Sequence, residues 1–153
     1  MYPTTDLVAV AWIATIPGLT ASGVGNQLPA TEAEWAAGGY VVVPLVVGGT
    51  PHSLSPVRRP VVQVDCYADN LNSDRIPWQR AAQLAEQIRF GTLDHYTFGR
   101  ALTITNGPVT YPVAAVKSAR MLTEPRRFWS DEGDYGAVTF DLALSWVAVG
   151  ETV

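Results

Sequence analysis

The clearest pattern of apolar and polar positions lies near the C-terminus, in residues 138–147. Every second residue there is bulky and apolar: Val138, Phe140, Leu142, Leu144 and Trp146. A period of two is typical of a β-strand with one buried face. The same period appears in residues 61–68, where Val62, Val64 and Cys66 share one face, and Gln63, Asp65 and Tyr67 share the other. The sequence therefore predicts two half-buried strands.

Two further β-rich runs are less regular. Residues 40–47 are mostly Val and Leu but contain Pro44, which predicts an edge position or a bulge because proline cannot donate to a strand ladder. Residues 109–122 predict a long strand that is interrupted at Pro112. The segment 94–107 shows no clear periodicity and is expected to be irregular.

A first helix is expected over residues 7–15, with Asp6 as its N-cap and Pro17-Gly18 as its stop. The segment is apolar nearly all round, so it should be buried on more than one side.

A second helix is expected from Trp78 to about Arg89, capped by Ser73 or Asp74 and ended by Gly91. Its apolar residues recur at helical spacing and define the buried stripe: Trp78, Ala81, Leu84, Ala85 and Ile88.

These elements give the order α-β-β-α-β-β. We expect one α+β domain over residues 1–153, built on a mainly antiparallel sheet of about four strands with two principal helices. Two long loops, residues 48–60 and 123–136, join the hairpins. Long loops inside a small domain are often functional or interfacial.

Composition narrows the classes of function. The chain has 153 residues, enough for one domain with a sizeable core. Only 16% of the residues are charged and the net charge is −4, with Lys117 as the only lysine. Tight DNA binding is not expected, because it usually needs a basic face. The low charge content suggests that partners cover part of the surface.

A search for catalytic and metal-binding motifs finds none. The chain lacks a nucleophile elbow, a phosphate loop and a dinucleotide fingerprint, and it has too few His and Cys for a closed zinc site. Cys66 is expected to be a buried apolar side chain. Weaker candidates are His95 beside Asp94 as an acid–base pair, and an acidic run that could hold a divalent ion: Asp131, Glu132 and Asp134. We expect no catalytic, cofactor or metal site.

One stretch carries a family resemblance. Residues 59–68 read Arg-Pro-Val-Val-Gln-Val-Asp-Cys-Tyr-Ala, and residues 81–89 read Ala-Ala-Gln-Leu-Ala-Glu-Gln-Ile-Arg. This strand followed by this helix resembles the tail terminator (tail-completion) proteins of long-tailed bacteriophages, specifically over about thirty residues. The resemblance implies a homo-hexameric ring that caps the tail tube, ends its polymerisation and joins the tail to the neck.

The resemblance also implies the partners: other copies of the chain, the tail-tube protein and the head or neck connector. DNA would pass through the lumen without specific binding. The expected location is the virion, assembled in the host cytoplasm. This agrees with a start that lacks a signal peptide and with an apolar run, residues 7–16, that is too short to span a bilayer.

Interface candidates follow from charge and aromatic content. Arginine and aromatic residues are enriched at protein interfaces. The polar candidates for ring contacts are Arg58, Arg59, Asp65 and Arg89. The candidates for docking in the second long loop are Arg126, Arg127, Phe128 and Trp129.

Other functions remain open at this stage. The chain is also compatible with another neck component, such as a head-completion or stopper protein. An enzyme built on Asp94, His95 and the acidic run is a second alternative, and a small cellular binding module is a third.

Overall fold

The computed structural model describes residues 3–19, 23–31, 35, 38–49, 54–69, 77–128 and 136–149. The helices are α1 (Thr5–Ile13), α2 (Trp78–Leu93) and a short 3₁₀ helix, η3 (His95–Thr97). The strands are β1 (Val24–Gly25), β2 (Tyr40–Gly49), β3 (Pro60–Ala68), β4 (Leu102–Asn106), β5 (Val109–Met121), β6 (Arg126–Phe128) and β7 (Gly136–Ala148).

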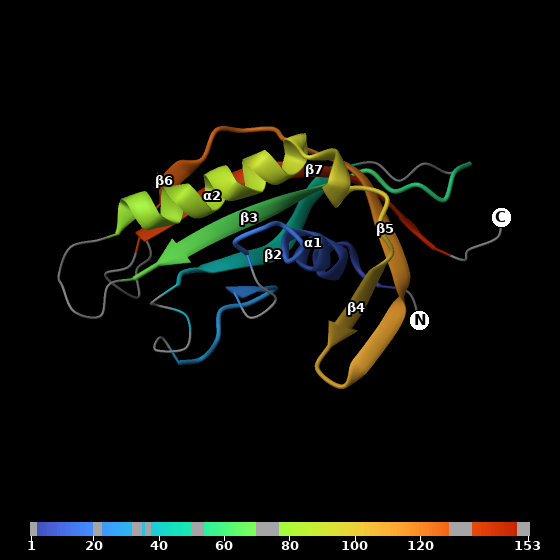
Figure 1. The fold of residues 1–153 in the computed structure, drawn as a ribbon, viewed down its shortest axis with the longest axis horizontal. Helices are drawn as coiled ribbons and strands as arrows, with labels where there is room; N and C mark the ends of the chain where they lie inside the picture. Colours follow the sequence, from blue (N-terminus) through green and yellow to red (C-terminus); the bar gives the residue numbers. More distant parts are fainter. Residues whose placement is uncertain are drawn as a thin grey trace.

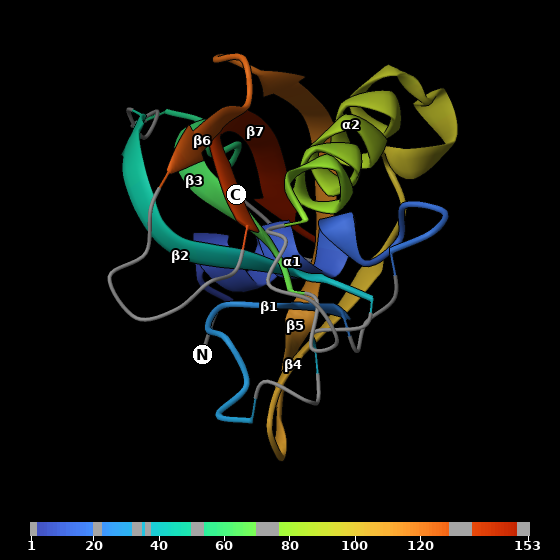
Figure 2. The ribbon, with the colours of Figure 1, turned by 90° about the vertical axis from the view of Figure 1, so that its left-hand side faces the viewer.

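All these strands belong to one curled sheet, in the order β1-β2-β3-β7-β5-β4, with β6 pairing β7 beyond the end of β5. The sheet wraps around α1, which contacts β1 and β2 near one end of the sheet and β4 at the other. Helix α2 packs on β3, β5 and β7, and both helices bury their apolar residues in one core. Figure 1 and Figure 2 show α2 beside the sheet and α1 within its curve.

The expectation of a four-stranded, mainly antiparallel α+β fold with the order α-β-β-α-β-β is wrong. The sheet has seven strands and is mixed, because β1 runs parallel to β2. The three strands beyond the four predicted for the sheet are β1, β4 and β6, which are two, five and three residues long. The sequence also suggests a short strand near residues 19–24, and β1 begins at the last of these residues. Such short strands show little alternation, and pairing with longer neighbours defines them.

Helix α1 is buried on several sides, as its apolar sequence predicts. Val8, Ala9, Trp12 and Ile13 are fully buried. The indole Nε1 of Trp146 on β7 donates a hydrogen bond to Thr5 Oγ1 at 3.3 Å and ties the start of α1 to the sheet. Asp6 is not the N-cap: the helix begins two residues earlier than predicted, Thr4 occupies the cap position, and Asp6 lies in the first turn.

Helix α2 buries its predicted stripe, although Trp78 is only half-buried. The expected caps Ser73 and Asp74 lie outside the described residues, and Pro77 occupies the cap position. Gly91 does not end the helix, which continues to Leu93. A Cβ at Gly91 would lie 2.6 Å from Ile16 Cδ1, so this glycine permits close packing between α2 and the chain after α1.

The long strands agree with the sequence pattern. Val62, Val64 and Cys66 are fully buried, and so are Phe140 and Leu142. Strand β5 continues through Pro112, but its register against β4 shifts between Tyr111 and Ala114, which confirms an irregularity at the predicted place. A second shift, against β7, lies between Val116 and Ser118. A register shift between Val42 and Leu45 confirms the bulge predicted from Pro44.

Cys66 is free and buried, as predicted. Desolvation is the main cause that raises the pKa of its thiol, and the nearby charge of Asp65 adds to it. The thiol is therefore protonated and unreactive at neutral pH.

Candidate assembly surfaces

The outer edge of β2 is open over most of its length. β1 pairs only with Val41 and Val42 on that side, so no described strand pairs with the rest of β2 there. Leu45, Val46 and Val47 are 45%, 46% and 45% exposed. The strand carries no charged residue. An exposed, apolar, uncharged edge is a template for pairing with another chain.

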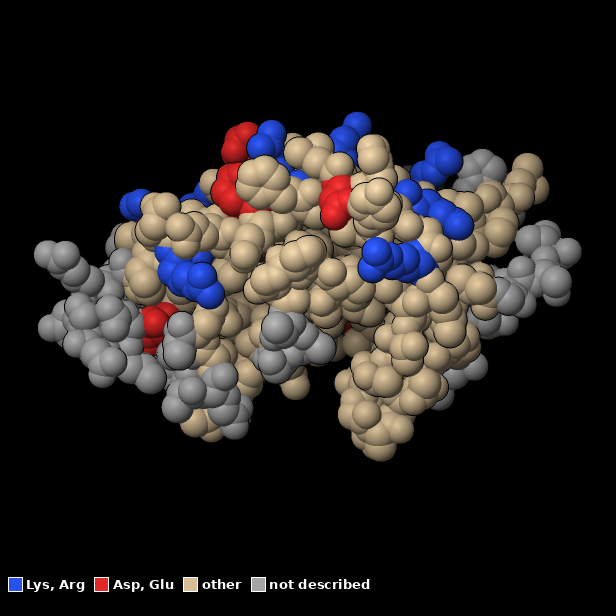
Figure 3. All heavy atoms as spheres, viewed as in Figure 1, with Lys and Arg blue, Asp and Glu red and all other residues tan. Residues whose placement is uncertain are grey.

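The other end of the sheet is a projecting hairpin, formed by β4 and β5. Residues 101–116 contain no charged residue, and residues 105–110 are all exposed. Figure 1 shows the hairpin extending away from the body, and Figure 3 shows it as an uncharged lobe. Among the described strands, β4 pairs with β5 alone. The sheet thus has two unlike open edges, and neither carries a charge.

A groove lies where the curled sheet fails to close, between β4 and β1. Helix α1 lines it together with residues of both strands, and its volume is about 420 Å³. A notch is visible beside the hairpin lobe in Figure 3. The lining has no charged residue and includes the apolar side chains of Leu7, Val10, Ala11, Val24 and Leu102.

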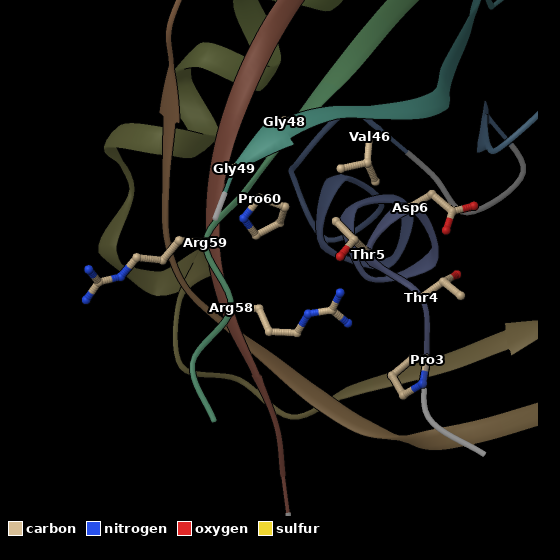
Figure 4. Close-up of a pocket in the computed structure, with 10 residues that line it drawn as sticks. All are labelled: Pro3, Thr4, Thr5, Asp6, Val46, Gly48, Gly49, Arg58, Arg59 and Pro60. Carbon is tan, nitrogen blue, oxygen red and sulfur yellow. The ribbon is translucent and has the colours of Figure 1, made fainter. Parts of the chain in front are cut away.

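A second pocket, of about 540 Å³, lies between the first turn of α1 and the adjoining ends of β2 and β3. Figure 4 shows Arg58 pointing across it toward Thr4 and Thr5, whereas Arg59 points away. The Arg58 guanidinium also lies 5.0 Å from the centre of the Trp146 ring, and its backbone pairs with Trp146. Arg58 is therefore held by its own subunit, while Arg59 is exposed beside the free end of β2.

Asp65 faces away from the main core, as predicted, but it is only 5% exposed. Gln63 Nε2 donates to both carboxylate oxygens, at 3.0 and 3.1 Å. Desolvation raises the pKa of Asp65, and it outweighs the lowering by the Thr139 and Gln63 side chains and by the charge of Arg126. Arg126 pairs across the sheet with Thr139, which in turn pairs with Asp65. This row of three residues crosses the outer face of the sheet.

Asp65→Asn is expected to raise the free energy of unfolding relative to the parent, by an amount that grows as the pH rises. The folded-state pKa of Asp65 is raised, so the protonated carboxyl favours the folded state. The stability that Asp65 contributes is fully present below the unfolded pKa and is lost as the pH rises through the folded pKa. Asparagine keeps a neutral acceptor for Gln63. Urea denaturation of both proteins from about pH 4 to about pH 7 measures the difference. If the difference in free energy of unfolding between variant and parent stays constant or shrinks as the pH rises, the pKa of Asp65 is not raised in the folded state.

The described aromatic and arginine residues of the second long loop pack on their own subunit. The Arg127 guanidinium lies 4.9 Å from the centre of the Trp78 ring, and Phe128 meets Tyr67 edge-on with ring centroids 5.9 Å apart. Trp129 and the acidic run 131–134 lie outside the described residues. Arg89 is exposed on α2. The structure therefore brings Asp65 close to Arg126, and Arg58 to Arg59, but it does not gather the predicted interface residues into one surface.

The acid–base alternative gains no support from the contacts of Asp94. Its carboxylate accepts a hydrogen bond from the Tyr96 backbone N–H at 3.0 Å and caps η3. Within the described ranges, no three His, Cys, Asp or Glu residues are placed to share a metal ion. No helix there is long and apolar enough to cross a membrane.

Comparison with solved structures finds a likeness in fold. No protein-family model and no curated protein matches the chain. The fold is similar to that of one chain in the solved virion of a native gene transfer agent particle. The two share 14% identity with a TM-score of 0.47, over 94% of this chain and 88% of the other. A likeness at this level establishes neither a family nor a function.

The sequence interpretation did not select the apolar residues of the open sheet edges. It selected arginines and aromatics, whereas the open edges consist of Leu45, Val46, Val47 and the neutral hairpin. The uninterrupted lack of charge in residues 101–116 was the signal that could have indicated the hairpin.

Proposed function

We propose that this protein is a structural subunit of a phage-like virion. It forms a closed homo-hexameric ring that caps the tail tube, ends its polymerisation and joins the tail to the head or neck connector. The observation that carries the proposal is the pair of unlike, open and uncharged edges at opposite ends of one sheet.

Unlike edges favour a ring over a symmetric dimer. A two-fold dimer uses the same patch on both subunits, whereas a head-to-tail contact joins two different patches and closes into a ring when the rotation permits. Each copy offers one edge at β2 and a different edge at β4. Pairing of these edges between successive copies would remove both open edges from solvent.

The tail-capping role is supported by the sequence resemblance. The resembling residues form β3 and α2, and these two elements pack against each other in the core. The action of such a ring is steric: it covers the growing end of the tube and presents its other face to the connector. A net charge of −4 suits a lumen through which DNA passes without binding.

The function is tested with purified tail-tube protein. Tubes that grow without limit should stop growing after this protein is added, and negative-stain images should show a ring at the tube end. Binding to the head-side connector but not to the tube would favour another neck component. Binding to neither would contradict a role in the virion neck.

Arg59→Glu is expected to weaken ring assembly. Arg59 is exposed beside the free end of β2, and a reversed charge at the rim of an interface costs about 1 kcal/mol, or roughly fivefold in the association constant. Sedimentation at several protein concentrations measures this change. Lys117→Glu, on β5, makes the same change in net charge and is the control. An equal effect of both substitutions would point to general repulsion and remove Arg59 from the interface.

A further inference from the structure

We infer that the ring contact is a strand inserted into a groove. The free part of β2 of one copy lies in the groove between α1 and β4 of the next copy, and it pairs with β4. This inference rests on the proposed ring and names the surfaces that build it.

The two edges match in length. Pro44 has no N–H to donate, so pairing on the outer side of β2 would begin at Leu45 and end at Gly49, a segment of five residues. β4 also has five residues. At 3.3 Å per residue each edge is about 17 Å long. One strand can therefore cover the other completely.

The side chains match in chemistry. Leu45, Val46 and Val47 are each almost half exposed. The groove offers apolar side chains on three elements: Leu7 and Val10 on α1, Val24 on β1, and Leu102 on β4. Neither the free part of β2 nor the groove lining contains a charged residue, and the charged side chains nearest to β2, such as Arg59, lie at the rim of the contact. Backbone hydrogen bonds to β4 would supply affinity and the groove would select the side chains.

The occupant is a second copy because one chain carries both halves of the contact. The halves lie toward opposite ends of the same sheet, and β2 and β4 do not pair within one copy. Insertion would join the β2-β3 end of one copy's sheet to the β4-β5 end of the next copy's sheet. Repetition would link the sheets of all subunits into one continuous ring.

Cysteine cross-linking tests this contact directly. Val46→Cys and Thr105→Cys are prepared as separate variants, since both positions are exposed and Thr105 lines the groove. The two are mixed and treated with a short bismaleimide. We expect a cross-linked dimer with one copy of each variant, at least tenfold more abundant than with either variant alone. Buried Cys66 should not react. Phe90→Cys on α2, mixed with Thr105→Cys, is the matched control.

The outcomes separate the contact from the function. Equal cross-linking by Val46→Cys alone would indicate that two β2 edges pair symmetrically and would overturn the inference. Rings seen by light scattering, with no cross-linking above the Phe90→Cys control, would overturn the inference and leave the ring proposal standing. A monomer in light scattering with no cross-linking would overturn both.

Discussion

Replacing Trp12 with alanine is expected to lower the free energy of unfolding by about 3–5 kcal/mol, the range for large aromatic truncations in a core. Trp12 is fully buried on α1, inside the curve of the sheet. It stacks on Phe98 with ring centroids 5.9 Å apart and an angle of 6° between the planes. The substitution leaves a cavity, and the surrounding residues, which belong to several strands, cannot all move inward to fill it. Urea denaturation followed by circular dichroism measures the loss.

Trp12→Phe is the control for this prediction. The indole Nε1 of Trp12 is buried and has no hydrogen-bond partner among the described residues. Phenylalanine keeps an aromatic ring and removes that unsatisfied donor, so it should cost clearly less than alanine. A loss below about 1 kcal/mol for Trp12→Ala would mean that α1 is not the centre of the core.

The double substitution Val46→Glu and Val47→Glu is expected to abolish self-association while leaving the fold intact. Both side chains are almost half exposed in the unassembled subunit, so glutamate there should change the free energy of unfolding by no more than about 0.5 kcal/mol. In an assembled ring two carboxylates would be buried without partners, which costs several kcal/mol. We expect the association constant to fall at least about 100-fold, a change of roughly 2.7 kcal/mol. Analytical ultracentrifugation measures it.

Phe90→Glu with Leu93→Glu provides the comparison. Both residues are 64% exposed on α2, which packs mainly on the central strands β3, β5 and β7. This variant has the same added charge and should assemble like the parent. Normal assembly of the β2 variant, or equal loss in the α2 variant, would show that the open edge of β2 is not the contact surface.

The elements that the sequence predicted are those with long, regular burial patterns. The alternation in residues 61–68 and 138–147 requires two strands with one buried face, and the stripe from Ala81 to Ile88 requires a helix. These elements form the centre of the sheet and one of its covering helices. Their local sequence and their tertiary surroundings favour the same structure.

The remaining elements depend on partners distant in the sequence. β1 exists because Val24 and Gly25 lie beside Val41 and Val42, and β6 because it continues the line of β5 along β7. Two or three residues contain no periodicity that could reveal such pairing. Gly91 illustrates the same limit: its position suggests a helix end, but contact with Ile16 explains it.

The candidate surfaces could not be predicted from the sequence, for a related reason. Leu45 to Val47 have the composition of a core strand, and only the sheet order shows that their outer side is open. Arg58 and Arg127 looked available as interface residues, but each stacks on a tryptophan of its own subunit. Strand order, which is a property of the whole chain, decides which apolar residues remain exposed.

The most direct test of a ring-forming tail terminator is the mass of the purified protein, alone and mixed with tail-tube rings, by light scattering with negative-stain imaging. The account predicts a hexamer with a central hole, closed either in solution or on the end ring of the tube. A protein that remains a monomer at every concentration and also fails to bind tail-tube rings would contradict it.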